Sequence, residues 1–113
     1  MIKILNKVGD ITGNDLFNAS TANPIKKAGS KEISGKMTGC AVVQKTDDET
    51  GEISVSSVIK LDGELYAGAS KVITNRLQEL IEFMGEEVIK NGVEIQFCEI
   101  DTKSGTGVSF ILK

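Results

Sequence analysis

Residues 53–70 read ISVSSVIKLDGELYAGAS, and this stretch decides the fold class. In its first half apolar residues alternate with polar ones, which is typical of a strand with one buried face. Asp62-Gly63 comes next, and this pair tolerates the positive φ angles that a two-residue type I′ turn requires. The stretch therefore predicts a hairpin whose second strand covers residues 64–69.

One helix is predicted directly after this hairpin. Ser70 is a suitable helix N-cap, and Gly85 stands where a C′ glycine would end the helix. Between them apolar residues recur at helical spacing. These residues are Val72, Ile73, Leu77, Leu80, Ile81 and Met84.

Two further strands are predicted toward the end of the chain. Their alternating apolar residues flank a polar, glycine-bearing turn at residues 101–107. They are Val93, Ile95 and Phe97 before the turn and Val108, Phe110 and Leu112 after it. The pattern predicts a second hairpin.

Residues 33–44 predict one more strand, upstream of the quoted stretch. Every second residue belongs to a face of small and apolar side chains. This face consists of Ile33, Gly35, Met37, Gly39, Ala41 and Val43. Glycines inside a strand favour a sharp bend. The polar turn 46–51 then returns the chain antiparallel into the next strand.

Residues 1–30 differ in composition from the rest. After a short apolar start at Ile2 they are rich in Asn, Gly, Thr and Ser, and they contain the only proline, Pro24. We predict a short strand and an irregular arm over residues 1–30, followed by one domain over residues 31–113.

The predicted order from residue 33 onward is β-β-β-α-β-β, an all-β chain with one helix. This is the order of the OB-fold, a small five-stranded barrel that binds oligonucleotides. A split sheet with one packed helix would give the same order. We expect an OB-fold barrel preceded by the N-terminal strand and arm, with the split sheet as the alternative.

Composition excludes several classes of protein. The chain has 113 residues with 13 basic and 16 acidic side chains, and a net charge of −3 argues against a broad coat for duplex phosphates. No apolar stretch approaches the roughly 18 residues of a membrane span. The first residues are too short and polar for a signal peptide, so we expect a cytoplasmic protein.

The supply of reactive side chains argues against an enzyme. There is no histidine, and Cys40 and Cys98 lack the close spacing of a zinc site. Both cysteines lie in predicted strands and are expected to be reduced core thiols. We expect no cofactor, no metal and no catalysis.

Several short motifs carry a resemblance to a known family. They are DGELYAGASK at residues 62–71, VEIQF at residues 93–97, KSG at residues 103–105, FIL at residues 110–112 and IKILN at residues 2–6. Together they resemble the single-stranded-DNA-binding proteins of protein-primed Bacillus phages, the phi-twenty-nine group, and related proteins of Gram-positive phages and mobile elements. The resemblance implies a protein that coats and protects displaced strands during phage-type DNA replication in the cytoplasm of a bacterial host.

Aromatic residues are the first candidates for binding, because each base stacked on an aromatic ring contributes about 1–3 kcal/mol. Tyr66 is preferred, since the small residues after it would let a nucleotide approach the sheet, although a tyrosine packed at the barrel edge is an equal alternative. Phe97 and Phe110 are further candidates, with core packing favoured for both. Phe83 is expected to pack, and Phe17 either to stack or to anchor the arm.

Seven lysines are candidate contacts to phosphates. Three point outward from the first two strands, one begins the helix, one lies at the tip of the last hairpin, and two form a basic cluster in the arm. In that order they are Lys36, Lys45, Lys60, Lys71, Lys103, Lys26 and Lys27. For each one alone, a solvated surface charge is the ordinary alternative. The acidic turn 47–49 should repel DNA.

Two other functions remain as alternatives to a largely sequence-independent single-stranded-DNA-binding protein. A protein-interaction or virion assembly module would use the strand from Ile2 to Val8 to pair with a neighbour's edge. A metal-dependent nuclease using Asp62, Glu64 or Asp101 is least favoured. Besides single-stranded DNA, the expected partners are replication proteins and further copies of the chain held through the N-terminal segment, with no membrane.

Overall fold

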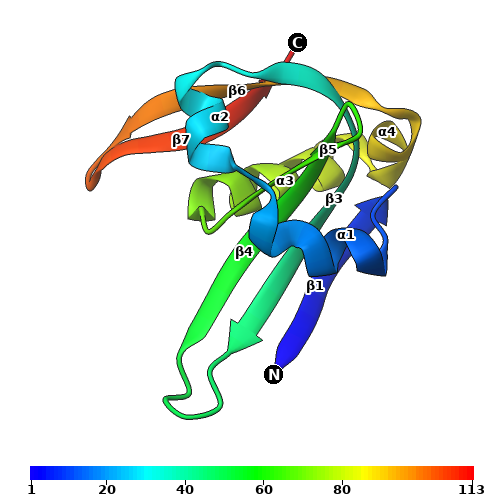
Figure 1. Cartoon of the computed structure of the whole chain (residues 1–113). Helices are drawn as coiled ribbons and strands as arrows, with labels where there is room; N and C mark the ends of the chain where they lie inside the picture. The colour runs from blue at the N-terminus through cyan, green and yellow to red at the C-terminus, as the bar shows by residue number, and fades with distance from the viewer.

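The computed structural model describes residues 1–113 and consists mainly of one seven-stranded mixed sheet that curls into a half-barrel (Figure 1). Short helices pack around this sheet. The elements in chain order are β1 (Ile2–Gly9), α1 (Gly13–Asn18), the 3₁₀-helix η1 (Ala19–Thr21), β2 (Asn23–Pro24), α2 (Ile25–Ser30), β3 (Ser34–Thr46), β4 (Ile53–Leu61), β5 (Glu64–Gly68), α3 (Lys71–Met84), α4 (Glu86–Asn91), β6 (Val93–Thr102) and β7 (Gly105–Leu112).

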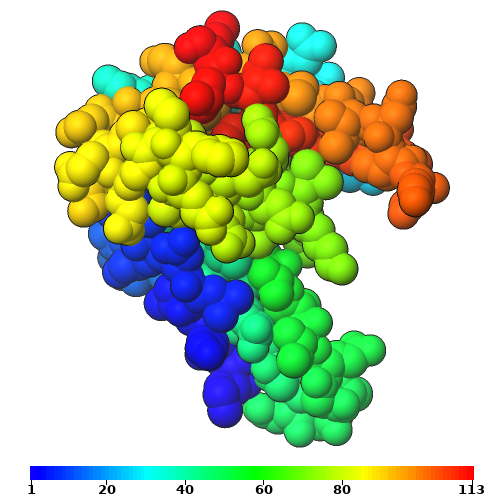
Figure 2. Space-filling model, turned by 180° about the vertical axis from the view of Figure 1, so that it is seen from behind, coloured from blue at the N-terminus to red at the C-terminus, as the bar shows by residue number.

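The long strand β3 organises the sheet. The strand order is β2-β5-β4-β3-β6-β7, and all pairs are antiparallel except β2 with β5. β4 pairs with one edge of β3. Along the other edge, β6 pairs with residues 34–37 and β1 pairs with residues 39–45. The β3–β4 and β6–β7 hairpins consequently project in different directions (Figure 1, Figure 2).

A bulge interrupts β3 at the point where the partner of its second edge changes from β6 to β1. Met37 pairs with Leu61 and Gly39 pairs with Lys60, so Thr38 is an extra residue. An inserted residue bends a strand and reverses its side-chain alternation. A side chain at Gly39 would begin 2.8 Å from backbone atoms of Asp10, so glycine permits this close approach.

The bulge makes the predicted face of β3 wrong beyond Met37. Cys40 and Val42 join Met37 in the main core, whereas Ala41 belongs to a separate small cluster and Val43 lines a groove on the opposite face. The prediction failed because this part of β3 is buried on both faces, so apolar residues occupy both parities and period 2 is hidden.

The main core lies inside the curled sheet and is closed by helices. It contains 17 buried residues, among them Phe97 and Phe110 from the last hairpin and Ile73, Leu77 and Leu80 from α3. Ser70 caps α3 by accepting a hydrogen bond from the Ile73 amide at 3.3 Å, and Gly85 ends the helix with φ +85°. Both predicted boundaries of this helix are confirmed.

The hairpin after β4 has the predicted geometry. Asp62 and Gly63 have φ values of +50° and +82°, as a type I′ turn requires. The Asp62 carboxylate also accepts a hydrogen bond from the Lys36 amide at 3.1 Å, which ties this turn to β3. The last hairpin is tighter than predicted, because β6 continues to Thr102 and β7 begins at Gly105.

The arm in residues 1–30 is not irregular, and α3 is not the only helix. α1 begins with a capping box between Thr12 and Asp15, and α2 buries Ile25 and Ala28 in the main core. α2 contacts β5 on one side and β6 and β7 on the other, so it covers the gap between the sheet edges. The prediction missed these helices because each has only six residues and no full helical period of apolar side chains.

The two cysteines are free thiols at different depths. Cys40 is buried in the main core, and burial raises the pKa of its thiol to about 12, with the Glu86 carboxylate adding to the effect. Cys98 is only half-buried. No helix in the structure has the length and apolar character needed to cross a membrane.

Candidate nucleic-acid interface

A groove of about 720 Å³ runs between the α1–η1 segment and the face of the sheet that points away from the main core. Figure 1 shows α1 lying across this part of the sheet. β1, β3, β4 and β5 supply the floor, and α1, η1 and β2 supply the opposite wall. The lining residues used below are Ile2, Ile4, Leu16, Phe17, Val43, Lys45, Ser56, Val58, Ala67 and Ala69.

Small side chains at the end of β5 keep part of the groove floor open. Ala67, Gly68 and Ala69 line it from the end of β5, where larger residues would fill the space. Ile11, Ala41 and Val58 form a small buried cluster beside it, against which Leu16 and Ala19 of the α1–η1 segment pack. The sheet thus carries a large core on one face and a small cluster with a groove on the other.

Phe17 is the aromatic residue that this groove presents. Its side chain is 85% exposed, because Leu16 and Ala19 are the residues of this segment that turn toward the sheet. Of the two roles expected for Phe17, the structure provides the geometry for stacking, since an exposed ring at a groove wall is open to a flat ligand.

The other three candidate aromatic residues are not open to a base. Tyr66, the preferred candidate, is only 9% exposed, and its ring lies 5.7 Å from that of Phe97 between centroids. Phe97 and Phe110 are fully buried, as their apolar neighbours favoured. Burial raises the pKa of the Tyr66 hydroxyl, which donates a long 3.5 Å hydrogen bond to Glu64. Tyr66 fills the core because alternate side chains of β5 point inward, and that of Tyr66 is one of them.

Lys60 is engaged by the protein itself. Its side chain is 19% exposed, and its ammonium lies 3.3 Å from the Asp10 carboxylate and 3.4 Å from the Asp15 carboxylate. The hydrogen bond to Asp10 is the main cause that raises the pKa of Lys60. The pKa of Asp15 is lowered, chiefly because the Thr12 amide donates to its carboxylate. Lys60 is therefore not a free phosphate contact as placed.

The six remaining candidate lysines are exposed, and one of them lines the groove. Lys45 lies at the groove end formed by β1 and β3. The others are distributed over separate elements: Lys36 on β3, Lys71 at the start of α3, Lys103 at the tip of the β6–β7 hairpin, and Lys26 and Lys27 on α2. The structure does not gather these five into one basic track.

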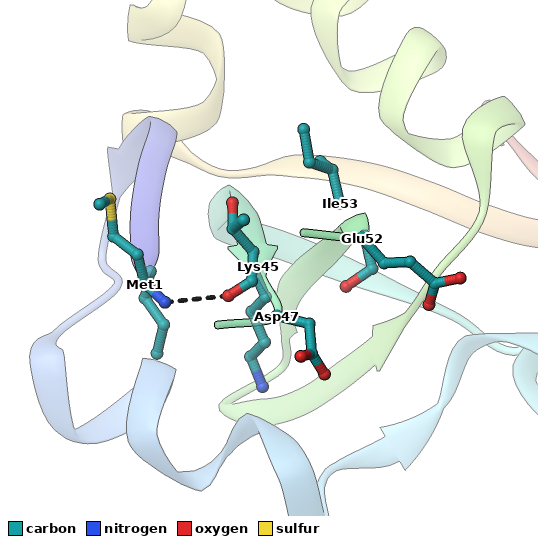
Figure 3. A pocket seen from close by; sticks show the side chains of 8 residues that line it. Met1, Lys45, Asp47, Glu52 and Ile53 are labelled. Carbon is teal, nitrogen blue, oxygen red and sulfur yellow. Dashed lines mark hydrogen bonds between the residues drawn. The ribbon is translucent and has the colours of Figure 1, made fainter. Parts of the chain in front are cut away.

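A second, more polar pocket adjoins the groove at Lys45. Figure 3 shows it between the start of β1 and the β3–β4 hairpin, with Lys45 between Met1 and the carboxylates of Asp47 and Glu52. The Met1 ammonium donates to the Thr46 carbonyl oxygen at 2.9 Å. The Met1 ammonium and Lys45 together match the two carboxylates in number, so this pocket has no net charge. The groove therefore has a charged end that is neutral overall and an apolar middle.

The opposite side of the molecule carries a separate apolar patch. Phe83, Met84 and Leu112 are exposed around a shallow pocket of about 160 Å³. Figure 2 shows the end of α3 in yellow close to the end of β7 in red. Phe83 is 80% exposed, so the expectation that it packs in the helix stripe is wrong. Its position on α3 lies outside the buried stripe of Ile73, Leu77 and Leu80.

The sequence does not reveal that β1 contributes to the groove floor. It predicts a strand that contains Ile2 and Ile4, and the structure adds that both side chains line the groove. The signal was present, because an edge strand with apolar residues at both parities cannot bury them all against one core. No three His, Cys, Asp or Glu side chains converge where they could hold a metal ion.

Comparison with known proteins gives no relative. The chain matches no protein-family model, no curated protein and no solved structure.

Proposed function

We propose that this protein is a non-catalytic single-stranded-DNA-binding protein of the OB type and that the groove beside α1 receives the strand. Its role would be to coat and protect displaced strands during phage-type DNA replication, largely without sequence preference. The observation that carries the proposal is the presence of an exposed aromatic ring, Phe17, and a cation, Lys45, along one groove with a largely apolar floor.

The sheet order supports this choice of groove. From β3 onward, the strands pair in the order β5-β4-β3-β6-β7, which is third, second, first, fourth and fifth along the chain. OB barrels are partly open, have five strands and bind oligonucleotides on the face of their second and third strands. β4 and β5 are the second and third strands here, and they supply Ser56, Val58 and Ala67 to the groove floor.

The chemistry of the groove fits one or two unstacked bases better than a long track. A base stacked on Phe17 would contribute about 1–3 kcal/mol, and the apolar floor suits the faces of flat bases. Lys45 is placed for one phosphate.

The decisive experiment compares two exposed phenylalanines. Fluorescence anisotropy would follow binding of a labelled oligothymidine of about 30 nucleotides at low and then physiological salt. We expect Phe17→Ala to weaken binding about 5- to 150-fold, which corresponds to one stacked base. Phe83→Ala is the matched control, because it removes an equally exposed ring on the opposite side, and its affinity should equal that of the wild type.

Two results would contradict the proposal. Absence of binding even at low salt would exclude single-stranded DNA as the ligand. Equal losses for Phe17→Ala and Phe83→Ala would exclude the groove as its site. Because Phe17 and Phe83 are both exposed, neither outcome would be confused with unfolding.

A protein-interaction or assembly module is the second candidate, and one observation favours it. Ten of the sixteen residues that line the groove are apolar, and β1 beside it pairs only with β3. Its other edge therefore carries backbone groups that no strand pairs. This candidate predicts self-association that Ile4→Lys abolishes, measured by analytical ultracentrifugation, together with no retention of oligothymidine.

A further inference from the structure

α1 is weakly attached to the sheet, although it forms one wall of the groove. None of its six residues is buried. Its apolar attachment consists of Leu16, together with Ala19 just beyond its end, against the small cluster. A helix of this length is not stable by itself in water. Whatever fixes α1 therefore also fixes the position of Phe17.

Lys60 connects β4 to two carboxylates, one that precedes α1 and one within it. Asp10 precedes α1, and its amide donates to the Thr38 carbonyl oxygen of the β3 bulge at 2.9 Å. Asp15 lies within α1, where the same carboxylate accepts from the Thr12 amide at 2.9 Å and contacts Lys60 at 3.4 Å. One ammonium thus bridges Asp10, whose amide is bonded to the sheet, and Asp15, the N3 residue of the capping box of α1.

We propose that Lys60 is a positioning residue that holds α1 over the face of β4 and β5 and thereby sets the groove wall that carries Phe17. The consequence for DNA rests on the function proposed above, whereas the attachment of α1 does not. Lys60 acts through Asp15 and Asp10 and does not contact the ligand. This role differs from the phosphate contact that strand parity predicts for Lys60.

The first arm of the test needs no DNA. Phe17→Trp places the only tryptophan of the chain on α1, and time-resolved fluorescence anisotropy reports its motion. In this background we expect Lys60→Met and Asp15→Asn each to add a nanosecond depolarisation component, which is the timescale of loop motion. Asparagine still accepts from the Thr12 amide, so Asp15→Asn removes the charge while it preserves the helix cap.

Three further variants separate positioning from general destabilisation. Lys60→Met combined with Asp15→Asn should add nothing to Lys60→Met alone, because Lys60→Met already removes the contact with Asp15. Lys60→Arg should restore the slow motion of Trp at position 17. Lys90→Met, which breaks the 3.5 Å contact with Glu87 on α4, is the matched control and should leave that motion unchanged. Unchanged motion in Lys60→Met would overturn the proposal.

The second arm measures oligothymidine affinity in the chain with Phe17 intact. We expect Asp15→Asn to weaken binding about threefold if α1 keeps its bound position about a third of the time. A gain in affinity would overturn the proposal, because it would mean that the carboxylate merely withholds Lys60 from phosphates. If the wild type binds no DNA, the proposed function fails, and the tryptophan arm still decides whether Lys60 positions α1.

Discussion

The two faces of the β3–β4 pair differ in what they do for the molecule. One face contributes to a core of 17 buried residues closed by α3 and α2, whereas the other supports only the cluster of Ile11, Ala41 and Val58 beneath α1. β3 and β4 supply side chains to both faces, because side chains alternate along each strand and because the bulge in β3 reverses that alternation. A large core makes the fold independent of the other face, so that face can keep a groove open to solvent.

The largest effect is expected in the main core. Phe97→Ala should lower the free energy of unfolding by about 3–5 kcal/mol, because it removes a fully buried ring and leaves a cavity beside Tyr66. Urea denaturation followed by circular dichroism measures this change. A loss below that of a single surface substitution would mean that the core face does not carry the stability.

A smaller effect is expected in the small cluster. Ile11→Ala should lower the free energy of unfolding by about 2 kcal/mol, at the low end for such truncations, because few neighbours surround this residue. The same denaturation experiment measures it. The comparison between the faces fails if Ile11→Ala costs as much as Phe97→Ala.

The smallest effect is expected from acid, and it should be confined to α1. The pKa of Asp15 is lowered in the folded protein, so its contribution is complete at neutral pH and is lost as the pH falls below about 4. The motion of Trp at position 17 should increase over that range while the circular dichroism of the sheet changes little. In Asp15→Asn this step should be absent, and its persistence would assign the transition to another carboxylate.

Local sequence rules were sufficient where neighbouring residues alone determine the geometry. The Asp62-Gly63 turn and the Ser70 and Gly85 boundaries of α3 all follow from backbone preferences of single residues. Of the seven strands, the sequence fails to predict only β2. This strand has two residues and exists because Asn23 and Pro24 lie beside β5. Such a pair has no local signature.

The candidate site was less predictable, because it depends on which face a strand turns to solvent. Strand parity predicts that Lys60 points outward, and for Tyr66 base stacking and packing at the barrel edge are equal alternatives. In the structure Tyr66 fills the core and Lys60 is bound by two carboxylates. Those carboxylates come from residues 10 and 15, which lie in the segment that the sequence predicts to be an irregular arm. The groove exists only after that arm has folded onto the sheet, so a strand-by-strand reading could not locate it.

The shared edge of β3 has a consequence for how the chain folds. Residues 2–9 pair with the later half of β3, and residues 93–96 pair with its earlier half. Contacts between such distant segments form slowly, because long loops must close before any pairing compensates for the lost entropy. During synthesis, β3, β4 and β5 can pair as soon as they emerge. The edge of β3 that β6 covers must remain open until nearly the whole chain has been made.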